Sequence, residues 1–228
     1  ISNLSYIHFT TSRNSFNSLK KIPIIDKSKI FFIGATAIKQ INQYLKSPKP
    51  VNQYVQGLVK KYVLITFHPV TLKNEPIDEI MQLCINKLID INYNLLSTYP
   101  NNDNGYKKII KVISDWRKHP NVYIVKNLGV PAYYSAIHDC EFVIGNSSSG
   151  IIEVPYFGKN VMNIGSRQDG RDKDASVYDV KAEMHSVEKM LDKFINKELM
   201  LTTCNKLYGD GNFNKKIINI LKNELKNE

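Results

Sequence analysis

The most informative stretch of the sequence is Phe142-Val143-Ile144-Gly145-Asn146-Ser147-Ser148-Ser149-Gly150-Ile151-Ile152-Glu153-Val154-Pro155. It predicts a short apolar strand, a turn of small residues and the start of an apolar helix. Backbone N–H groups at such a junction are free and lie at the positive end of the helix dipole, which suits a phosphate. Glu153, about one helical turn on, is placed to accept hydrogen bonds from a ribose diol. A serine-capped helix start without any ligand is the alternative, and this stretch alone leaves both open.

Strand-like and helix-like segments alternate along the rest of the chain. Apolar runs predict strands at residues 5–10, 30–33, 62–67, 93–98, 122–125, 142–144 and 161–164. Helices are predicted at residues 12–21, 75–91, 106–116, 131–138, 150–157, 187–195 and 212–225. Such alternation predicts an α/β fold, with a doubly wound, mostly parallel Rossmann-like sheet and helices on both faces. The paired prolines of residues 47–50 (Ser-Pro-Lys-Pro) mark the clearest linker.

Composition indicates an ordinary globular protein of 228 residues, with 43% hydrophobic and 23% charged residues. No apolar run approaches the roughly 20 residues that cross a bilayer, and no signal peptide is evident. We therefore expect a cytoplasmic protein without membrane association. The three cysteines, Cys84, Cys140 and Cys204, are far apart and show no zinc-site spacing, which is typical of buried thiols in a reducing compartment.

A net charge of +10 raises the possibility of nucleic-acid binding. Only four of the 31 basic residues are arginine, and the basic residues are scattered rather than massed. Asn and Ile are also abundant, so a compositional bias explains the charge more simply. We expect no nucleic-acid partner.

Polar loops follow several of the predicted strands. Ligands of open α/β sheets bind beyond the carboxyl ends of the strands, where these loops converge. The loops are residues 67–71, 100–103, 145–150 and 165–168. A Gly-x-Gly-x-x-Gly fingerprint and a Walker loop are both absent, so a dinucleotide cofactor or ATP hydrolysis is not expected. The convergence strengthens the prediction of a nucleotide site.

Four motifs occur in a recognisable order: Phe67-His68-Pro69-Val70-Thr71, Gly145–Gly150 with Glu153, Gly165-Ser166-Arg167-Gln168-Asp169-Gly170-Arg171, and Tyr208-Gly209-Asp210-Gly211-Asn212. Together they resemble the hydrolysing UDP-N-acetylglucosamine 2-epimerases of sialic-acid biosynthesis, over nearly the whole chain. Non-hydrolysing relatives typically carry His-Arg-x-Glu-Asn and Ser-Gly-Gly-x-x-Glu-Glu at the corresponding places. This sequence has neither, so the hydrolysing branch fits better.

The resemblance implies the second, nucleotide-binding half of a GT-B fold. Residues 1–46 then form the end of an N-terminal domain and a linker, residues 47–211 the Rossmann-like domain, and residues 212–228 a helix that packs back on the N-terminal domain. In the family reaction UDP is eliminated to leave a 2-acetamidoglucal, and water then adds to give N-acetylmannosamine. The family's catalytic carboxylates belong to the missing N-terminal domain. We also expect a homo-oligomer without a cofactor, and no metal, because the sequence has no HxxxH spacing or carboxylate cluster.

The resemblance assigns a catalytic role to His68 at the junction of sugar and phosphate, where an imidazolium stabilises the departing UDP or passes a proton. A structural histidine bonded to neighbouring backbone is the alternative. Asn101 matches a polar residue on the ligand side, although asparagine is common in turns anyway.

Four further positions match substrate-binding residues of the family. Ser147 and Ser148 match serines that contact phosphate, and Glu153 matches the ribose-binding glutamate. Arg167 matches an arginine near the phosphates, where a planar guanidinium suits bidentate binding. The alternative for Arg167 is a salt bridge with Asp169 or Asp172.

Two other functions remain open from the sequence. One is a hydrolysing 2-epimerase for a UDP-diacetamido-bacillosamine-type sugar, because the sugar is read mostly by the missing half. The other is the nucleotide-binding subunit of a two-chain GT-B glycosyltransferase.

Overall fold

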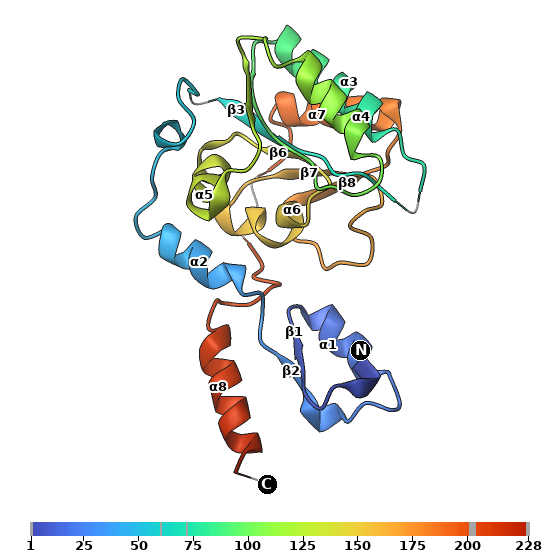
Figure 1. The fold of residues 1–228 in the computed structure, drawn as a ribbon, viewed down its shortest axis with the longest axis vertical. Helices are drawn as coiled ribbons and strands as arrows, with labels where there is room; N and C mark the ends of the chain where they lie inside the picture. Colours follow the sequence, from blue (N-terminus) through green and yellow to red (C-terminus); the bar gives the residue numbers. More distant parts are fainter. Residues whose placement is uncertain (1, 60, 72, 201–203, 227–228) are drawn as a thin grey trace.

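A six-stranded parallel sheet organises the larger part of the chain (Figure 1). The computed structural model describes residues 2–59, 61–71, 73–200 and 204–226. The sheet has the order β5-β4-β3-β6-β7-β8, and every neighbouring pair is parallel. Its strands are β3 (Tyr62–Thr66), β4 (Asn94–Thr98), β5 (Val122–Val125), β6 (Val143–Gly145), β7 (Val161–Ile164) and β8 (Val177–Val180). The predicted doubly wound α/β fold is confirmed.

Helices cover both faces of this sheet (Figure 1). One face carries α3 (Ile77–Asp90), α4 (Tyr106–Asp115) and α7 (Met184–Ile195), and the other carries α2 (Ala37–Tyr44), α5 (Gly129–Asp139) and α6 (Ser148–Ile152). Strand β3 is buried along its whole length. Val63 and Ile65 enter the core on the first face, whereas Tyr62 and Leu64 enter the core on the second. A strand buried on both faces has to be apolar at every position, which is why it reads as a continuous apolar run.

Three elements differ from the sequence-based expectation. The first two are α2 and β8, which the sequence did not indicate. In α2 only Ile38 and Ile41 are buried, and β8 is an edge strand that pairs with β7 alone. The third is the helix predicted at residues 150–157, which divides into α6 and a 3-10 helix at Val154–Phe157. Pro155 lacks the N–H that a continuing α-helix needs, so α-helical bonding stops there.

A smaller unit lies at the other end of the molecule (Figure 1). It contains a two-stranded parallel sheet of β1 (His8–Thr10) and β2 (Ile30–Phe32), with α1 (Arg13–Lys20) and α8 (Phe213–Glu224). Lys29 forms an ion pair with Glu224, which ties α8 to the small sheet. The remaining short elements are 3-10 helices at Ser2–Leu4, Lys27–Lys29 and Val51–Gln53.

Two segments join the small unit to the large one and touch where they cross. The Ala35 N–H donates to the Tyr208 carbonyl at 2.7 Å. A Cβ at Gly34 would lie 2.7 Å from that same carbonyl oxygen, and a Cβ at Gly209 would lie 2.9 Å from the Cα of Gly34. Both glycines have positive φ, so their type is required for conformation and for space.

The packing of α2 bears on where the domains divide. Ile38 and Ile41 are fully buried in the same core as Leu64, and Val51, which follows the proline-rich linker, is buried there too. This packing favours a boundary between β2 and α2 over one at residue 46. The division at residues 46 and 211 stays a prediction.

Candidate functional site

The site lies where the chain reverses its direction across the sheet. From β3 the chain moves outward to β4 and β5, and it then returns to β6 beside β3 and moves outward the other way. Loops at such a switch point diverge and leave a crevice at the carboxyl ends of the strands. Gly145 ends β6 with φ 148°, and a Cβ there would lie 1.9 Å from the Thr66 carbonyl oxygen. Only glycine lets the two central strands, β3 and β6, approach so closely at their carboxyl ends.

A hollow of about 620 Å³ opens at this switch point, within the usual range for ligand sites. Four of the predicted residues line it: His68 after β3, Asn101 after β4, and Ser147 and Glu153 after β6. The structure thus brings these four residues together around one hollow, and their roles stay predictions. The rest of the lining is Thr66, Thr98, Tyr99, Pro100, Lys126, Asn127, Leu128, Gly129, Val130, Tyr133, Tyr134 and Ser149.

His68 is held in one ring orientation and one tautomer. Its Nδ1 accepts the backbone N–H of Asn101 at 3.0 Å, so the proton of the neutral ring lies on Nε2. Burial and the positive charge of Arg167 lower the pKa of His68 to about 4, while Asp103 opposes the shift. At neutral pH the free protein therefore presents an N–H donor at this position, and the imidazolium expected from the sequence is disfavoured.

The serine loop presents backbone donors more than hydroxyls. Ser147 caps α6, because its Oγ accepts the Ser149 N–H at 3.4 Å. The Ser149 hydroxyl is bonded to Tyr133 at 2.8 Å. Among the described residues, the N–H groups of Ser147 and Ser148 and the hydroxyl of Ser148 have no hydrogen-bond partner. Helix α6 has only five residues, so its dipole is weaker than the predicted helix implied, and anion binding here depends on individual N–H groups.

Glu153 reaches the hollow from the residue after α6. Its Oε1 accepts the Tyr134 hydroxyl at 3.5 Å, and no other described side chain donates to this carboxylate. Burial raises the pKa of Tyr134, and the neighbouring Glu153 charge adds to that rise. The carboxylate is thus available to accept further hydrogen bonds.

Arg167 and Ser148 lie beside the hollow but do not line it. Arg167 Nη1 donates to the Asn146 carbonyl at 3.3 Å, and Nη2 lies 3.9 Å from Asp103 Oδ2. The carboxylates considered from the sequence are engaged elsewhere: Asp169 pairs with Lys73, and Asp172 accepts the Asn14 N–H. Arg167 is half-buried, and this burial lowers its pKa.

The loop that carries Arg167 is fixed by a carboxylate from the loop after β3. Glu75 accepts both the N–H and the hydroxyl of Ser166, at 3.1 and 2.6 Å. A Cβ at Gly165 would lie 2.1 Å from Glu75 Oε2, so glycine is needed for this contact. The loops after β3 and β7 are therefore tied together.

Sequence reasoning missed the part of the hollow formed by Tyr99 and residues 126–130. Residues 126–130 follow β5 directly, so the carboxyl-end rule would have found them. Tyr133 and Tyr134 lie on α5, and no sequence signal marks them as lining residues.

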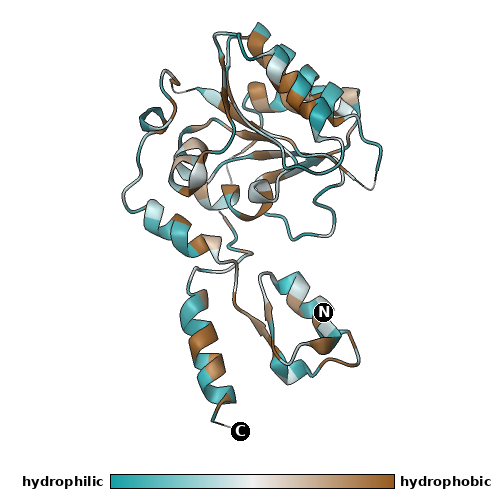
Figure 2. Cartoon of the chain, viewed as in Figure 1, coloured by the Kyte–Doolittle hydropathy of each residue, from teal (hydrophilic) through white to brown (hydrophobic). Residues whose placement is uncertain are grey.

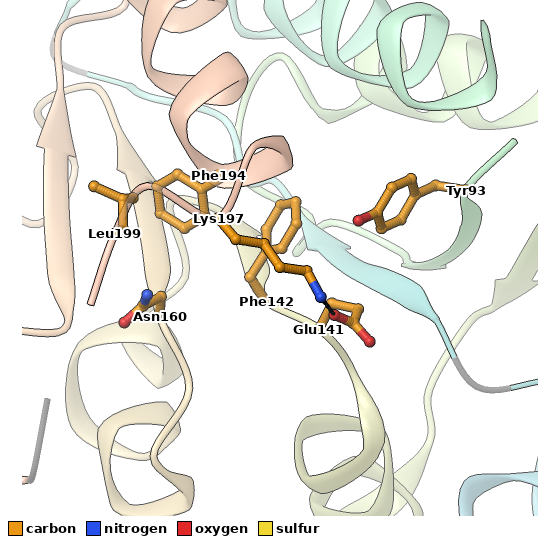
Figure 3. A pocket seen from close by; sticks show the side chains of 7 residues that line it. All are labelled: Tyr93, Glu141, Phe142, Asn160, Phe194, Lys197 and Leu199. Carbon is orange, nitrogen blue, oxygen red and sulfur yellow. Dashed lines mark ion pairs between the residues drawn. The ribbon is translucent and has the colours of Figure 1, made fainter. Parts of the chain in front are cut away.

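A second hollow, of about 230 Å³, lies at the opposite ends of the strands (Figure 3). Tyr93, Phe142 and Asn160 precede β4, β6 and β7, so this hollow is at the amino ends of the strands. Lys197 and Glu141 form an ion pair of 3.5 Å beside it. None of the predicted site residues lines it.

Two kinds of feature are absent from the described part of the chain. No three His, Cys, Asp or Glu side chains in it converge as metal ligands. No helix in it has both the length and the apolar character to span a bilayer.

Comparison with known proteins relates this arrangement to one family. The family model for UDP-N-acetylglucosamine 2-epimerase matches residues 1–222. The chain is 32% identical to a UDP-N,N'-diacetylbacillosamine 2-epimerase (hydrolyzing) of Legionella pneumophila, over 97% of this chain and 59% of that protein. It is 30% identical to a GDP/UDP-N,N'-diacetylbacillosamine 2-epimerase (hydrolyzing) of Campylobacter jejuni, over 87% of this chain and 52% of that protein. The chain thus spans somewhat more than half the length of these relatives.

Solved structures agree at the level of the fold. The UDP-GlcNAc 2-epimerase of Neisseria meningitidis bound to UDP-GlcNAc superposes with a TM-score of 0.78 at 20% identity, covering 97% of this chain and 62% of that one. The enzyme of Methanocaldococcus jannaschii in complex with UDP-GlcNAc and UDP gives 0.74 at 15% identity, covering 96% and 61%. A family match over nearly the whole chain shows that the chain belongs to the UDP-N-acetylglucosamine 2-epimerase family, and the shared fold is that of the C-terminal half of its GT-B architecture.

Proposed function

We propose that this chain is the UDP-sugar-binding half of a hydrolysing 2-epimerase. The observation that carries the proposal is the hollow at the switch point, where His68, Ser147 and Glu153 meet from loops after two adjacent strands. A nucleoside diphosphate needs donors for phosphate oxygens and an acceptor for ribose hydroxyls. This hollow and its margin supply both.

The diphosphate lies at the β3–β6 side of the hollow in this proposal. The free N–H groups of Ser147 and Ser148, the Arg167 guanidinium and the His68 Nε2–H are its donors. Glu153 accepts from the ribose diol, with Tyr134 holding its other oxygen. The space beside Tyr99, Pro100 and residues 126–130 is left for the base.

In the proposed reaction, the C1–O bond of UDP-N-acetylglucosamine breaks as a base removes the C2 proton, and a glycal and UDP result. Water then adds across the double bond, giving hydroxyl to C1 and hydrogen to C2, so that the products are N-acetylmannosamine and UDP. Negative charge grows on the leaving phosphate during the first step. A His68 N–H donor that strengthens as this charge develops lowers the barrier.

The acid and base that act on the sugar are expected outside this chain. Glu153 is the one carboxylate in the lining of the hollow, and the proposal assigns it to the ribose. General acid and base groups each contribute roughly 10²–10⁴-fold. A partner domain that carries such groups fits the 59% coverage of the Legionella relative.

A UDP-N,N'-diacetylbacillosamine-type sugar is the second candidate substrate. Two of the most similar relatives, at 32% and 30% identity, carry that activity in their names. The contacts proposed here engage the UDP moiety, which both sugars share. The choice between the two sugars therefore rests on the part of the enzyme outside this chain.

The test measures UDP released by the purified 228-residue chain in a coupled assay with each sugar. We expect release far below about 1 per second, the low end of ordinary enzymatic rates, because two acid–base groups are missing. A protein extended upstream of Ile1 by about one domain should turn over one of the two sugars. Ordinary turnover by the 228-residue chain would place the catalytic groups within it and refute the proposed division of roles.

A further inference from the structure

Asn146 lies at the centre of the site without lining the hollow. It directly follows β6 and is fully buried. Its Oδ1 accepts the His68 N–H at 2.7 Å, and its Nδ2 donates to the His68 carbonyl at 2.8 Å. A primary amide offers the same donor and acceptor as a peptide group. The side chain therefore adds one more rung between the two central strands, beyond the last backbone pair of Thr66 and Gly145.

The backbone of the same residue holds the loop after β7. The Asn146 carbonyl accepts Arg167 Nη1 at 3.3 Å and Gln168 Nε2 at 2.8 Å. Gln168 is buried, so this second contact is shielded from water. Asn146 thus contacts two segments that follow different strands. One segment carries His68, and the other carries Arg167.

We propose that Asn146 is a positioning residue that fixes His68 and Arg167 relative to each other, so that both meet one diphosphate. This inference rests on the proposed function. The side-chain amide of Asn146 holds the His68 backbone, and the main-chain carbonyl of the same residue accepts from Arg167, so the amide links the His68 loop to the point that holds Arg167. Both amide atoms are already bonded within the protein, so Asn146 acts through these neighbours and not on the ligand.

The first experiment compares Asn146→Ala with Asn160→Ala as a matched control. Asn160 is also a buried asparagine next to a strand of the same sheet, but it precedes β7 and so lies at the amino ends of the strands (Figure 3). Binding of UDP and of uridine is followed by chemical-shift titration of the 228-residue chain. We expect Asn146→Ala to weaken UDP binding about tenfold or more, equal to about 1.4 kcal/mol, and to leave uridine binding nearly unchanged. Asn160→Ala should alter neither.

The second experiment needs no ligand. Selective ¹⁵N labelling of histidine reports the tautomer and pKa of His68 in the free chain. In the parent, the neutral ring should carry its proton on Nε2. In Asn146→Ala the loosened loop admits water, so the pKa of His68 should rise from about 4 toward its ordinary value of 6.5. In Asn160→Ala the pKa of His68 should be unchanged.

These readouts separate the inference from the proposed function. A parent chain that binds no UDP would refute the function, and the His68 titration would still decide the role of Asn146. An unchanged His68 titration in Asn146→Ala, or an equal loss of UDP and uridine binding, would overturn the inference. If Asn146→Ala does not fold, Asn146→Ser replaces it. Serine has one polar side-chain atom where asparagine has two, so this variant cannot keep both contacts with the His68 backbone, and an effect in the same direction is expected.

Discussion

His68 shows how surroundings set the chemistry of a single residue. Its Nδ1 is committed to the Asn101 N–H, and its main chain is clamped by the Asn146 amide. Burial disfavours the charged ring, and Arg167 disfavours it further. A bound diphosphate would act in the opposite sense, because negative charge stabilises imidazolium. We therefore expect UDP binding to raise the pKa of His68.

At this scale the first prediction concerns acid sensitivity. The pKa of His68 is about 4 in the folded chain and 6.5 in the unfolded one, so the unfolded chain binds the proton more readily between these values. The free energy of unfolding should fall as the pH drops from 6.5 to 4, by at most about 3 kcal/mol from this group. Urea unfolding at pH 7 and pH 4.5 measures the fall, which should be smaller in His68→Asn.

The matched control is His119→Asn. His119 also accepts a backbone N–H through Nδ1, from Asn121 at 3.2 Å, but it lies outside the hollow. If both variants reduce the acid-induced loss of stability by the same amount, the special environment ascribed to His68 is wrong.

At the scale of elements, the loop between β6 and α6 divides its work between neighbouring serines. Ser147 caps the helix through its hydroxyl, whereas the hydroxyl of Ser148 has no partner in the described part of the chain. The two residues are adjacent and half-buried alike. A helix cap acts on the folded state, but a ligand contact acts only when the ligand is bound.

The second prediction uses this pair. Ser147→Ala should lower the free energy of unfolding by about 1 kcal/mol, the usual cost of losing a cap. Ser148→Ala should leave stability within about 0.5 kcal/mol and weaken UDP binding several-fold. Urea unfolding and calorimetry of both variants give the comparison. A Ser148→Ala chain that unfolds early and binds UDP normally would make Ser148 structural.

The sequence predicted the short apolar strands of the large sheet best. The bounds of β5 and β7 agree with the expected residues 122–125 and 161–164, and β3 is one residue shorter than expected. Segments held by distant partners were harder to predict. Asp174 lies in a run of charged residues typical of a solvated loop, yet it is buried and accepts hydrogen bonds from Ser176 and Asn205. Nothing local in the sequence marks a partner 31 residues away.

The residues of the candidate site were likewise predictable only in part. Parallel topology brings the loops after β3, β4 and β6 together, so their convergence could be expected from the alternation of strands and helices. The family resemblance then pointed to His68, Asn101, Ser147 and Glu153 within these loops. The contact of Arg167 with Asp103 depends on how two loops fold against each other. Periodicity and motif spacing carry no information on such contacts, which is why the sequence proposed other partners for Arg167.

At the scale of the whole molecule, α8 presents an apolar face without cover. Ile218, Leu221 and Leu225 are 50%, 40% and 72% exposed, and Figure 2 shows hydrophobic residues along this helix. Contiguous exposed apolar surface favours association. A domain that packs on α8 is part of the proposed enzyme, and in its absence we expect copies of the chain to associate through this face. The homo-oligomer implied by the family stays a separate prediction.

The third prediction follows from this face. Ile218→Lys should weaken self-association of the 228-residue chain about tenfold or more, since burying one isoleucine contributes about 1.5–3 kcal/mol. Asn219→Lys adds the same charge at an exposed neighbouring position and is the control. Sedimentation velocity over a concentration series measures both. Equal effects of the two variants would show that added charge, and not the apolar face, governs association.

The central claim is that the hollow at the carboxyl ends of the central strands binds UDP. Isothermal titration calorimetry of the 228-residue chain with UDP and ADP tests it most directly. The two ligands share the diphosphate and differ in base. We predict that UDP binds with a Kd below about 1 mM, equal to about −4 kcal/mol, and that ADP binds at least about tenfold more weakly. Absence of UDP binding at millimolar concentration, or equal binding of UDP and ADP, would contradict the account.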